Sequence, residues 1–199
     1  MIYLVRHGES EANLNKRYSG ITDVELSIKG LKEAITAGDN LKAYKIEHIY
    51  SSPLKRARNT AEIICDRNSI DINEIIIEDC LIEVNFGLFE NLTWEEIREQ
   101  YREESENWIL NKQKYKFPEG ESYADIIKRI SDFVDNIPDN SLIVTHFGVI
   151  QSILLYLNIA DDTNLWDYVI NNCDIVVIDK NKKEVEIIIK NNYESEPSV

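Results

Sequence analysis

Residues 2–8 have the sequence IYLVRHG, a short apolar run that ends in polar and small residues. Continuous apolar runs of this kind predict strands that are covered on both faces, as in a parallel sheet. Similar runs occur at residues 46–51, 75–77 and 142–145. We therefore predict that all four segments are strands of one central, mostly parallel sheet.

Helical patterns separate these runs. Ser52 followed by Pro53 predicts a capped helix start, with proline at the first helical position. Thr93 and Glu96 have the spacing of a capping box. Five segments are expected to be helical: residues 27–43, 52–65, 93–108, 123–134 and 149–157.

The last apolar segments differ from the others because they are close together in the chain. Residues 175–178 and 185–189 flank a polar turn and predict an antiparallel hairpin at the edge of the sheet. The predicted fold class is therefore α/β, a three-layer sandwich with helices on both faces of the sheet. Because no linker divides the chain, we expect a single domain over residues 1–199, in which the polar residues 191–199 form a loose tail.

The composition excludes several classes of partner. The 199 residues include 36 acidic and 22 basic side chains, for a formal net charge of −14. Such a body repels nucleic acids and acidic lipids, so neither a nucleic-acid nor a membrane partner is expected. No apolar run approaches the ~18 residues that cross a bilayer, and no signal peptide is evident. Three cysteines without a Cys-x-x-Cys spacing predict free thiols in a cytoplasmic protein.

Two of the three histidines directly follow predicted strands. His7 and His146 have this setting, whereas His48 does not and is expected at the surface. Ligands of α/β folds bind beyond the carboxyl ends of the strands, so the first two histidines should face one crevice together with Arg6. A neutral imidazole can attack phosphorus, and arginine offers forked donors to phosphate oxygens. These residue types in this place favour phosphate chemistry.

Four short blocks contain these residues in a fixed order. They are Arg6-His7-Gly8-Glu9-Ser10, Ser51-Ser52-Pro53-Leu54-Lys55-Arg56-Ala57, Leu81-Ile82-Glu83 with Phe86-Gly87, and Thr145-His146-Phe147-Gly148. The blocks span residues 2–155, and the chain resembles the histidine phosphatase (phosphoglycerate mutase-like) superfamily in all four. The match is specific because blocks of this kind rarely occur together in one order by chance.

The resemblance implies a role for each of the central residues. His7 would be the nucleophile and would become a phosphohistidine for part of each turnover. Arg6 and Arg56 would bind the phosphate oxygens, and His146 would be a second imidazole at the transferring group. Glu83 would protonate the leaving alkoxide and then take a proton from the attacking water.

Supporting roles fall on four further residues. Asn13 would donate one more hydrogen bond to the phosphate, and Glu9 is a weaker candidate for the general acid. Ser19 and Gly20 either approach the phosphate through a loop or form a plain turn. No P-loop and no Asp/His cluster with the spacing of a two-metal site is present, so we expect no metal and no cofactor.

Three functions are compatible with these blocks. A phosphomonoester hydrolase is favoured over a cofactor-dependent phosphoglycerate mutase, which needs extra basic residues where residues 83–108 offer only Arg98 and Arg102. A non-catalytic phosphate-binding module is disfavoured because both the candidate nucleophile and the candidate acid are present.

The identity of the substrate is less constrained than the reaction. Residues 86–90 and 118–122 look most like the small bacterial α-ribazole phosphatases, and broad-specificity relatives share these features. We therefore expect a small phosphorylated metabolite, with α-ribazole 5′-phosphate as one candidate. Asn91 and Phe147 stand where relatives commonly carry glycine, and both departures bear on the size of the substrate.

Overall fold

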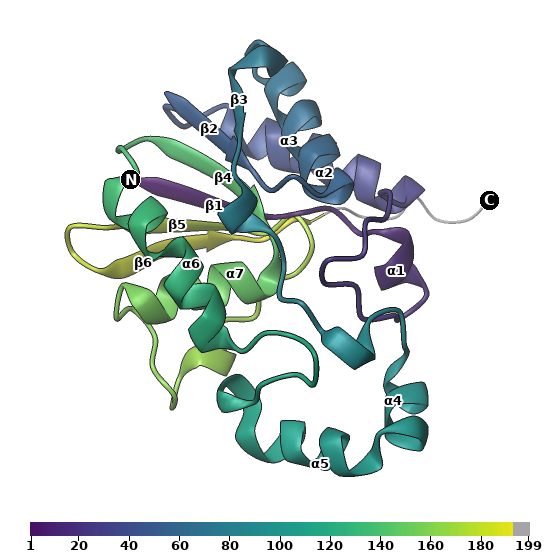
Figure 1. The fold of residues 1–199 in the computed structure, drawn as a ribbon. Coiled ribbons are helices and arrows are strands. Elements are labelled where there is room, and N and C mark those ends of the chain that lie inside the picture. The colour runs from purple at the N-terminus through teal and green to yellow at the C-terminus, as the bar shows by residue number, and fades with distance from the viewer. Residues whose placement is uncertain (193–199) are drawn as a thin grey trace.

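The computed structural model of the protein describes residues 1–192. Six strands form one sheet in the order β3-β2-β4-β1-β5-β6, in which β1 to β4 pair in parallel and β5 and β6 in antiparallel fashion (Figure 1). The predicted fold class is thereby confirmed, including the hairpin near the C-terminus. The strands are β1 (Ile2–Arg6), β2 (His48–Ser51), β3 (Ile75–Ile77), β4 (Ser141–Thr145), β5 (Ile175–Asp179) and β6 (Glu184–Ile189).

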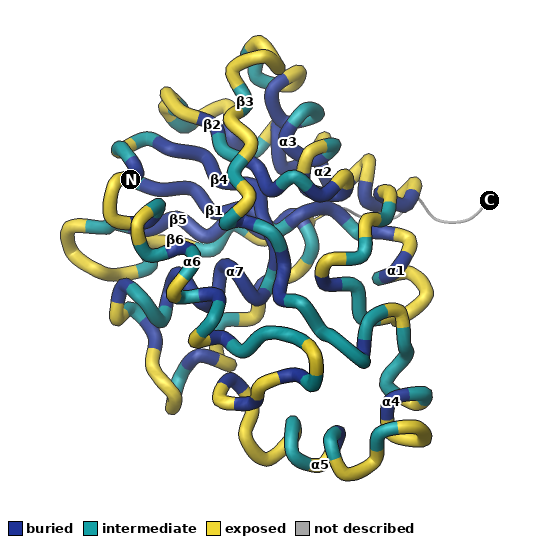
Figure 2. The backbone as a smooth tube through the Cα atoms, in the orientation of Figure 1, coloured by how far each residue is buried: buried dark blue, intermediate teal, exposed yellow. Residues whose placement is uncertain are grey.

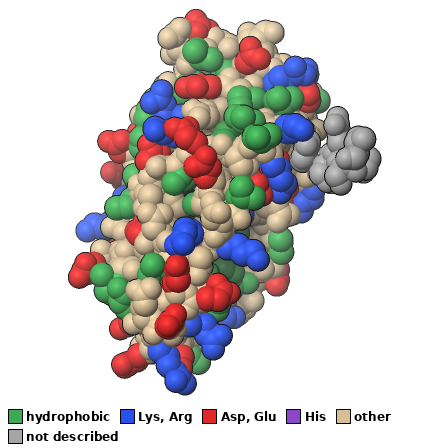
Figure 3. All heavy atoms as spheres, turned by 90° about the vertical axis from the view of Figure 1, so that its right-hand side faces the viewer, with side chains coloured by type: hydrophobic (Ala, Val, Ile, Leu, Met, Phe, Trp, Pro, Cys, Tyr) green, Lys and Arg blue, Asp and Glu red, His purple; other side chains and the backbone are tan. Residues whose placement is uncertain are grey.

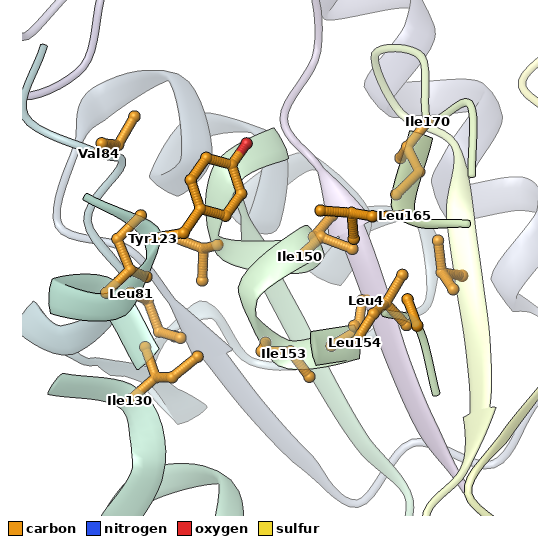
Figure 4. Packing of buried hydrophobic residues seen from close by; sticks show 14 of the residues in the cluster. Leu4, Leu81, Val84, Tyr123, Ile130, Ile150, Ile153, Leu154, Leu165 and Ile170 are labelled. Carbon is orange, nitrogen blue, oxygen red and sulfur yellow. The ribbon is translucent and has the colours of Figure 1, made fainter. Parts of the chain in front are cut away.

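Helices cover both faces of this sheet. The helices α2 (Ile28–Leu41) and α3 (Lys55–Arg67) pack on one face, and α6 (Tyr123–Asn136) and α7 (Phe147–Tyr156) pack on the other. Alternate residues of β1 point to opposite faces, so that Leu4 joins the core under α6 and α7, shown in Figure 4, while Val5 joins the core under α2 and α3. Figure 2 shows the central strands buried throughout, as their continuous apolar sequences predict.

Shorter helices make up the connections. They are α1 (Glu11–Leu14), α4 (Trp94–Gln100), α5 (Arg102–Asn111) and the 3-10 helices η1 (Ile72–Glu74), η2 (Asp79–Leu81), η3 (Gly87–Phe89), η4 (Lys112–Lys114) and η5 (Leu165–Asp167). The helices α4 and α5 lie away from the sheet, at the bottom of the view in Figure 1. Within residues 1–192, no helix is both long and apolar enough to span a bilayer.

Two predicted helices differ from the observed ones. The expected helix over 93–108 is broken at Tyr101, whose φ of −134° and ψ of 52° lie outside the helical region, although Thr93 does form the predicted capping box with Glu96. The expected start at Ser52 is wrong, because α3 begins only after Leu54 and has no side-chain cap. The hydroxyl of Ser52 instead lies 2.8 Å from a ring nitrogen of His146.

The predicted loose tail, residues 191–199, lies outside the described residues except for its first two. Asn191 donates its backbone N–H to Asp174 at 2.9 Å and its side-chain amide to the carbonyl of Glu33 at 2.7 Å. At this position the chain is therefore attached to the rest of the domain.

A contact between two glycines fixes the segment that follows β1. A Cβ atom on Gly8 would lie 2.5 Å from the carbonyl oxygen of Gly30, and a Cβ on Gly30 would lie 2.0 Å from the carbonyl oxygen of Glu9. Both glycines are required because the loop packs directly on the first turn of α2. The same turn is tied to the loop by the Glu9 carboxylate, which accepts hydrogen bonds from Ser27 at 2.8 Å and Lys29 at 3.0 Å.

Replacing Gly30 by alanine should displace this loop. Because the new methyl group meets backbone rather than a flexible side chain, Gly30→Ala should lower the free energy of unfolding by about 1–3 kcal/mol in urea titrations. The control Ile28→Ala, at an exposed position of the same helix, should change it by less than about 0.5 kcal/mol. An unchanged unfolding midpoint for Gly30→Ala would contradict the close packing.

Candidate active site

A cavity of about 560 Å³ lies at the carboxyl ends of the parallel strands. Register places Arg6 of β1 beside Thr145 of β4, so the two residues that follow, His7 and His146, reach the same edge of the sheet. The backbone N–H of His7 donates to the carbonyl of Thr145 at 2.9 Å, which continues the strand pairing to the edge. The crevice predicted from the strand ends is therefore present, and its lining includes Arg6, His7, Asn13, Ser19, Arg56 and Glu83.

His7 presents an unprotonated ring nitrogen to this cavity. Its Nδ1 lies 2.7 Å from the carbonyl oxygen of Gly8, which can only accept, so Nδ1 carries the proton and Nε2 carries the lone pair. Burial, together with the nearby charges of Arg56 and Arg6, lowers the pKa of His7 well below its ordinary value of 6.5. The imidazole is therefore neutral at neutral pH, which is the form that can act as a nucleophile.

His146 lies behind His7 rather than on the cavity wall. The two ring centroids are 5.0 Å apart, with an angle of 60° between the ring planes. The Nε2 of His146 meets the Ser52 hydroxyl at 2.8 Å, and its buried Nδ1 has no hydrogen-bond partner among the described residues. Burial also lowers the pKa of this imidazole well below its ordinary value. Contact of His146 with a phosphoryl group remains a prediction.

Two guanidinium groups, those of the half-buried Arg6 and the buried Arg56, supply positive charge to the cavity. Arg6 donates Nη1 to the carbonyl of Ile170 at 2.8 Å, while its buried Nε has no partner. Arg56 is only 1% exposed, and within residues 1–192 neither arginine forms an ion pair. Burial is the main cause that lowers the pKa of both guanidinium groups from the ordinary value of 12.5. Arginine nevertheless stays charged at neutral pH. Cations that lie in a cavity without a direct ion pair are suited to an anionic ligand.

The loop at residues 19–22 positions Arg56. The guanidinium donates to the carbonyl oxygens of Ser19 at 3.0 Å, Gly20 at 2.7 Å and Thr22 at 2.9 Å. The carboxylate of Glu90 holds the loop from the other side, because it accepts from the backbone N–H groups of Gly20, Ile21 and Thr22. Ser19 lines the cavity, but Gly20 does not, and its N–H already bonds to Glu90. Gly20 instead holds Arg56 through its carbonyl oxygen, and contact of this loop with a phosphate stays a prediction.

Glu83 is a buried carboxyl group, only 7% exposed, on the wall of the same cavity. Its oxygens accept from the backbone N–H groups of Val84 at 2.8 Å and Gly148 at 3.2 Å. Burial nevertheless outweighs these hydrogen bonds and the charge of Arg56, and raises the pKa of Glu83 above 4.5. A carboxyl group with a raised pKa can keep a proton for donation. A Cβ on Gly148 would lie 2.6 Å from Oε1, so this contact requires glycine at that position.

Asn13 also lines the cavity, and its side chain carries an acceptor oxygen and a donor NH₂ group. Its Oδ1 accepts from the backbone and hydroxyl of Ser10 at 3.1 and 3.0 Å and from Asn172 at 3.3 Å. The oxygen is thus occupied, which leaves the NH₂ group as the donor for a ligand. Glu9, the weaker candidate for the acid, is bonded to Ser27 and Lys29 and does not line the cavity.

Some residues of the site are missed by sequence reasoning. Ser52 is predicted as a helix cap, although its place directly after β2 is the same signal that identifies His7 and His146. Asn172 carries no such signal in the sequence. It donates to the carbonyl of His7 at 2.9 Å because the chain before β5 passes next to His7. Asn91 has a φ of 62°, which lies in the left-handed region. Asparagine tolerates this region, as glycine does.

The comparisons with known proteins agree with this geometry. Residues 2–192 match the histidine phosphatase superfamily (branch 1). The chain belongs to this superfamily. It is 31% identical to phosphoserine phosphatase 1 of Hydrogenobacter thermophilus over 96% of the chain and 91% of that protein. It is also 31% identical to the "Probable phosphoglycerate mutase GpmB" of Erwinia tasmaniensis, over 89% of the chain and 84% of that protein.

Similarity of fold extends to solved structures. The α-ribazole phosphatase of Shigella flexneri superposes with a TM-score of 0.80 over 98% of this chain and 99% of that one, at 22% identity. At this identity the superposition establishes a shared fold only. Membership of the superfamily makes the chain a phosphatase or a mutase, and the names of its relatives support phosphatase activity.

The buried histidines make stability depend on pH. Because the folded state lowers the pKa of His7, the unfolded chain binds more protons below the ordinary histidine pKa, and stability falls as the pH falls. The loss of unfolding free energy between about pH 7.5 and about pH 5.5 should therefore be smaller in His7→Gln. Glu83 has the opposite effect on stability. Because its pKa is raised in the folded state, acidification favours the folded state at this group. Glu83→Gln should therefore enlarge the loss of unfolding free energy between the two pH values.

Urea titrations at the two pH values measure both effects. His48→Gln is the matched control, because this histidine is exposed at the start of β2. A pH dependence that is identical in the native chain and in His7→Gln would contradict a buried, neutral imidazole.

Proposed function

We propose that the chain is a metal-independent phosphomonoester hydrolase that acts through a phosphohistidine on His7. The observation that carries the proposal is the placement of the unprotonated Nε2 of His7 in one cavity with two unpaired guanidinium groups. The cations bind the phosphate oxygens and reduce the negative charge that would repel a nucleophile. Without them, a chain of net charge −14 would repel its own substrate.

The first step transfers the phosphoryl group to the enzyme. The Nε2 of His7 attacks phosphorus while the bond from phosphorus to the alcohol oxygen breaks. Glu83 gives its proton to that oxygen, so the alcohol leaves uncharged and Glu83 becomes a carboxylate.

The second step restores the enzyme. Water attacks the phosphohistidine, Glu83 takes one proton from the water, and the nitrogen–phosphorus bond breaks. Inorganic phosphate leaves, and His7 and Glu83 return to their starting forms.

A phosphoglycerate mutase is the second candidate and is less well supported. A mutase must bind a second anionic group of its substrate, which calls for unpaired cations beyond the phosphate site. Two further cations line the cavity: Arg17 is paired with Glu96 at 2.9 Å, which leaves Lys16. Glu95 adds negative charge to the same lining. A non-catalytic module is not favoured, since a nucleophile and an acid are both in place.

We infer a small phosphorylated metabolite as the substrate, with α-ribazole 5′-phosphate as a specific candidate. The candidate is supported by the motif over residues 86–90 and by the fold shared with the Shigella flexneri enzyme. The face shown in Figure 3 mixes acidic and basic side chains, which agrees with a small-molecule substrate rather than a nucleic acid. Three unpaired cysteines are in keeping with a cytoplasmic location.

Acid quenching during turnover tests the covalent step. A ³²P-labelled phosphomonoester should leave an acid-labile phosphoryl group on the native chain. The label should be absent from His7→Ala, whose turnover should fall by at least about 10³-fold. The native rate should be unchanged by EDTA. An active enzyme that never carries label would refute the phosphohistidine, and loss of activity in EDTA would reveal a metal.

Leaving-group dependence tests the role of Glu83. In Glu83→Gln, hydrolysis of alkyl phosphates should slow by about 10²–10⁴-fold, because their alkoxides need a proton to leave. Hydrolysis of p-nitrophenyl phosphate should slow far less, since p-nitrophenolate leaves without one. Equal slowing of both substrates would argue against Glu83 as the general acid.

A further inference from the structure

A second cavity of about 510 Å³ adjoins the phosphate site. Four aromatic side chains line both cavities, so the two spaces meet along a common wall. We call the second space the aromatic chamber; its lining consists of Tyr18, Trp94, Trp108, Ile109, Lys112 and Trp166. Nothing in the proposed phosphoryl transfer uses these residues.

A continuous aromatic surface leads from the phosphate site into the chamber. The Arg6 guanidinium lies 5.3 Å from the ring centroid of Phe147, and the Phe147 ring lies 6.4 Å from that of Trp166. Phe147 is the first residue of α7 and follows His146 directly. On the other side, Trp108 meets Tyr18 at 5.2 Å and Trp94 at 5.8 Å, both edge to face.

The chamber offers mostly apolar surface, with the side chain of Lys112 as its one charged member. The indole N–H of Trp166 donates to the side-chain oxygen of Gln113 at 3.1 Å, yet the residue remains 41% exposed. Ile109, which is also exposed, extends the apolar lining. Exposed indole and aliphatic surface inside a concave space is typical of a site that a ligand covers.

We propose that the aromatic chamber binds a planar aromatic ring carried by the alcohol portion of the substrate. This inference rests on the proposed function, because the phosphate must be anchored by Arg6 and Arg56 for the alcohol to extend along Phe147. Rings pack on aromatic walls in offset or edge-to-face geometry. An amino-acid alcohol such as that of phosphoserine has no ring and gains no such contact.

Matched alkyl phosphates test the chamber without changing the chemistry. The substrates are 2-(2-naphthyl)ethyl, 2-cyclohexylethyl and n-propyl phosphate, all primary alkyl esters whose leaving alcohols have similar acidity. In the native enzyme, kcat/KM for the naphthyl ester should exceed that for the propyl ester by at least about tenfold. The cyclohexyl ester should fall clearly below the naphthyl ester, because it lacks a planar face.

Variants locate the site of this preference. In Trp166→Ala the ratio of naphthyl to propyl kcat/KM should fall at least about fivefold, and Trp166→Phe should recover most of it. Val169→Ala is the matched control, since Val169 is 60% exposed nearby in the chain but lines neither cavity. A native ratio near one, a cyclohexyl ester equal to the naphthyl ester, or a ratio unaffected in Trp166→Ala would each overturn the proposal.

Binding of phosphonates separates this proposal from the proposed function. The non-hydrolysable 2-(2-naphthyl)ethyl and n-propyl phosphonates are titrated calorimetrically against the native chain and Trp166→Ala. Tighter binding of the naphthyl compound, by about tenfold and lost in Trp166→Ala, supports the chamber even if no ester is hydrolysed. Equal binding of the two compounds overturns the chamber even if every ester is hydrolysed.

Discussion

Two positive charges without a direct ion pair, those of the buried Arg56 and the half-buried Arg6, are the constraint on which the site depends. Arg6 and Arg56 are held at the edge of the sheet by backbone carbonyls, which accept hydrogen bonds from the guanidinium groups without cancelling their charge. A carboxylate partner would bind each arginine as well, but it would leave no positive potential for a substrate. The carbonyl dipoles offset part of the cost of burying the charges, and the remaining potential makes an anion site in a chain of net charge −14.

The same charges set the protonation states of the groups around them. They disfavour a proton on His7, which adds to the effect of burial and leaves the lone pair on Nε2 available. They also favour the ionised form of Glu83, but there burial dominates and the pKa rises. The pKa values of the candidate nucleophile and of the candidate acid are therefore shifted in opposite directions within one cavity: the pKa of His7 is lowered and that of Glu83 is raised.

Further residues surround this general arrangement. The carboxylate of Glu90 organises the loop that holds Arg56, and Asn91 follows it in a left-handed conformation that asparagine tolerates. Phe147 extends from the first turn of α7 toward Trp166 and gives the cavity an aromatic wall. The phosphate end of the site is thus built at the strand ends, whereas the chamber next to it is lined by residues of other segments.

Local sequence determined the strands, most helices and the residues at the strand ends. Buried strands need continuous apolar runs, and β1 and β4 could therefore be found together with His7 and His146 directly after them. The break at Tyr101 and the late start of α3 could not be found, because local patterns and caps favour a longer helix in both places. For the same reason the sequence predicts Ser52 as a helix cap. Its hydroxyl instead forms a hydrogen bond with His146, which lies far away along the chain.

The tertiary structure alone decided which side chains meet. Asn172 reaches His7, and Glu90 reaches the loop at residues 19–22, only because chain segments separated by many residues fold side by side. The same kind of contact between distant segments places His146 behind His7 and lets the carbonyl of Gly20 hold Arg56. It also forms the aromatic chamber. Periodicity and capping describe neighbours along the chain, whereas a cavity is formed by contacts between elements, and those depend on how the whole sheet and its helices pack.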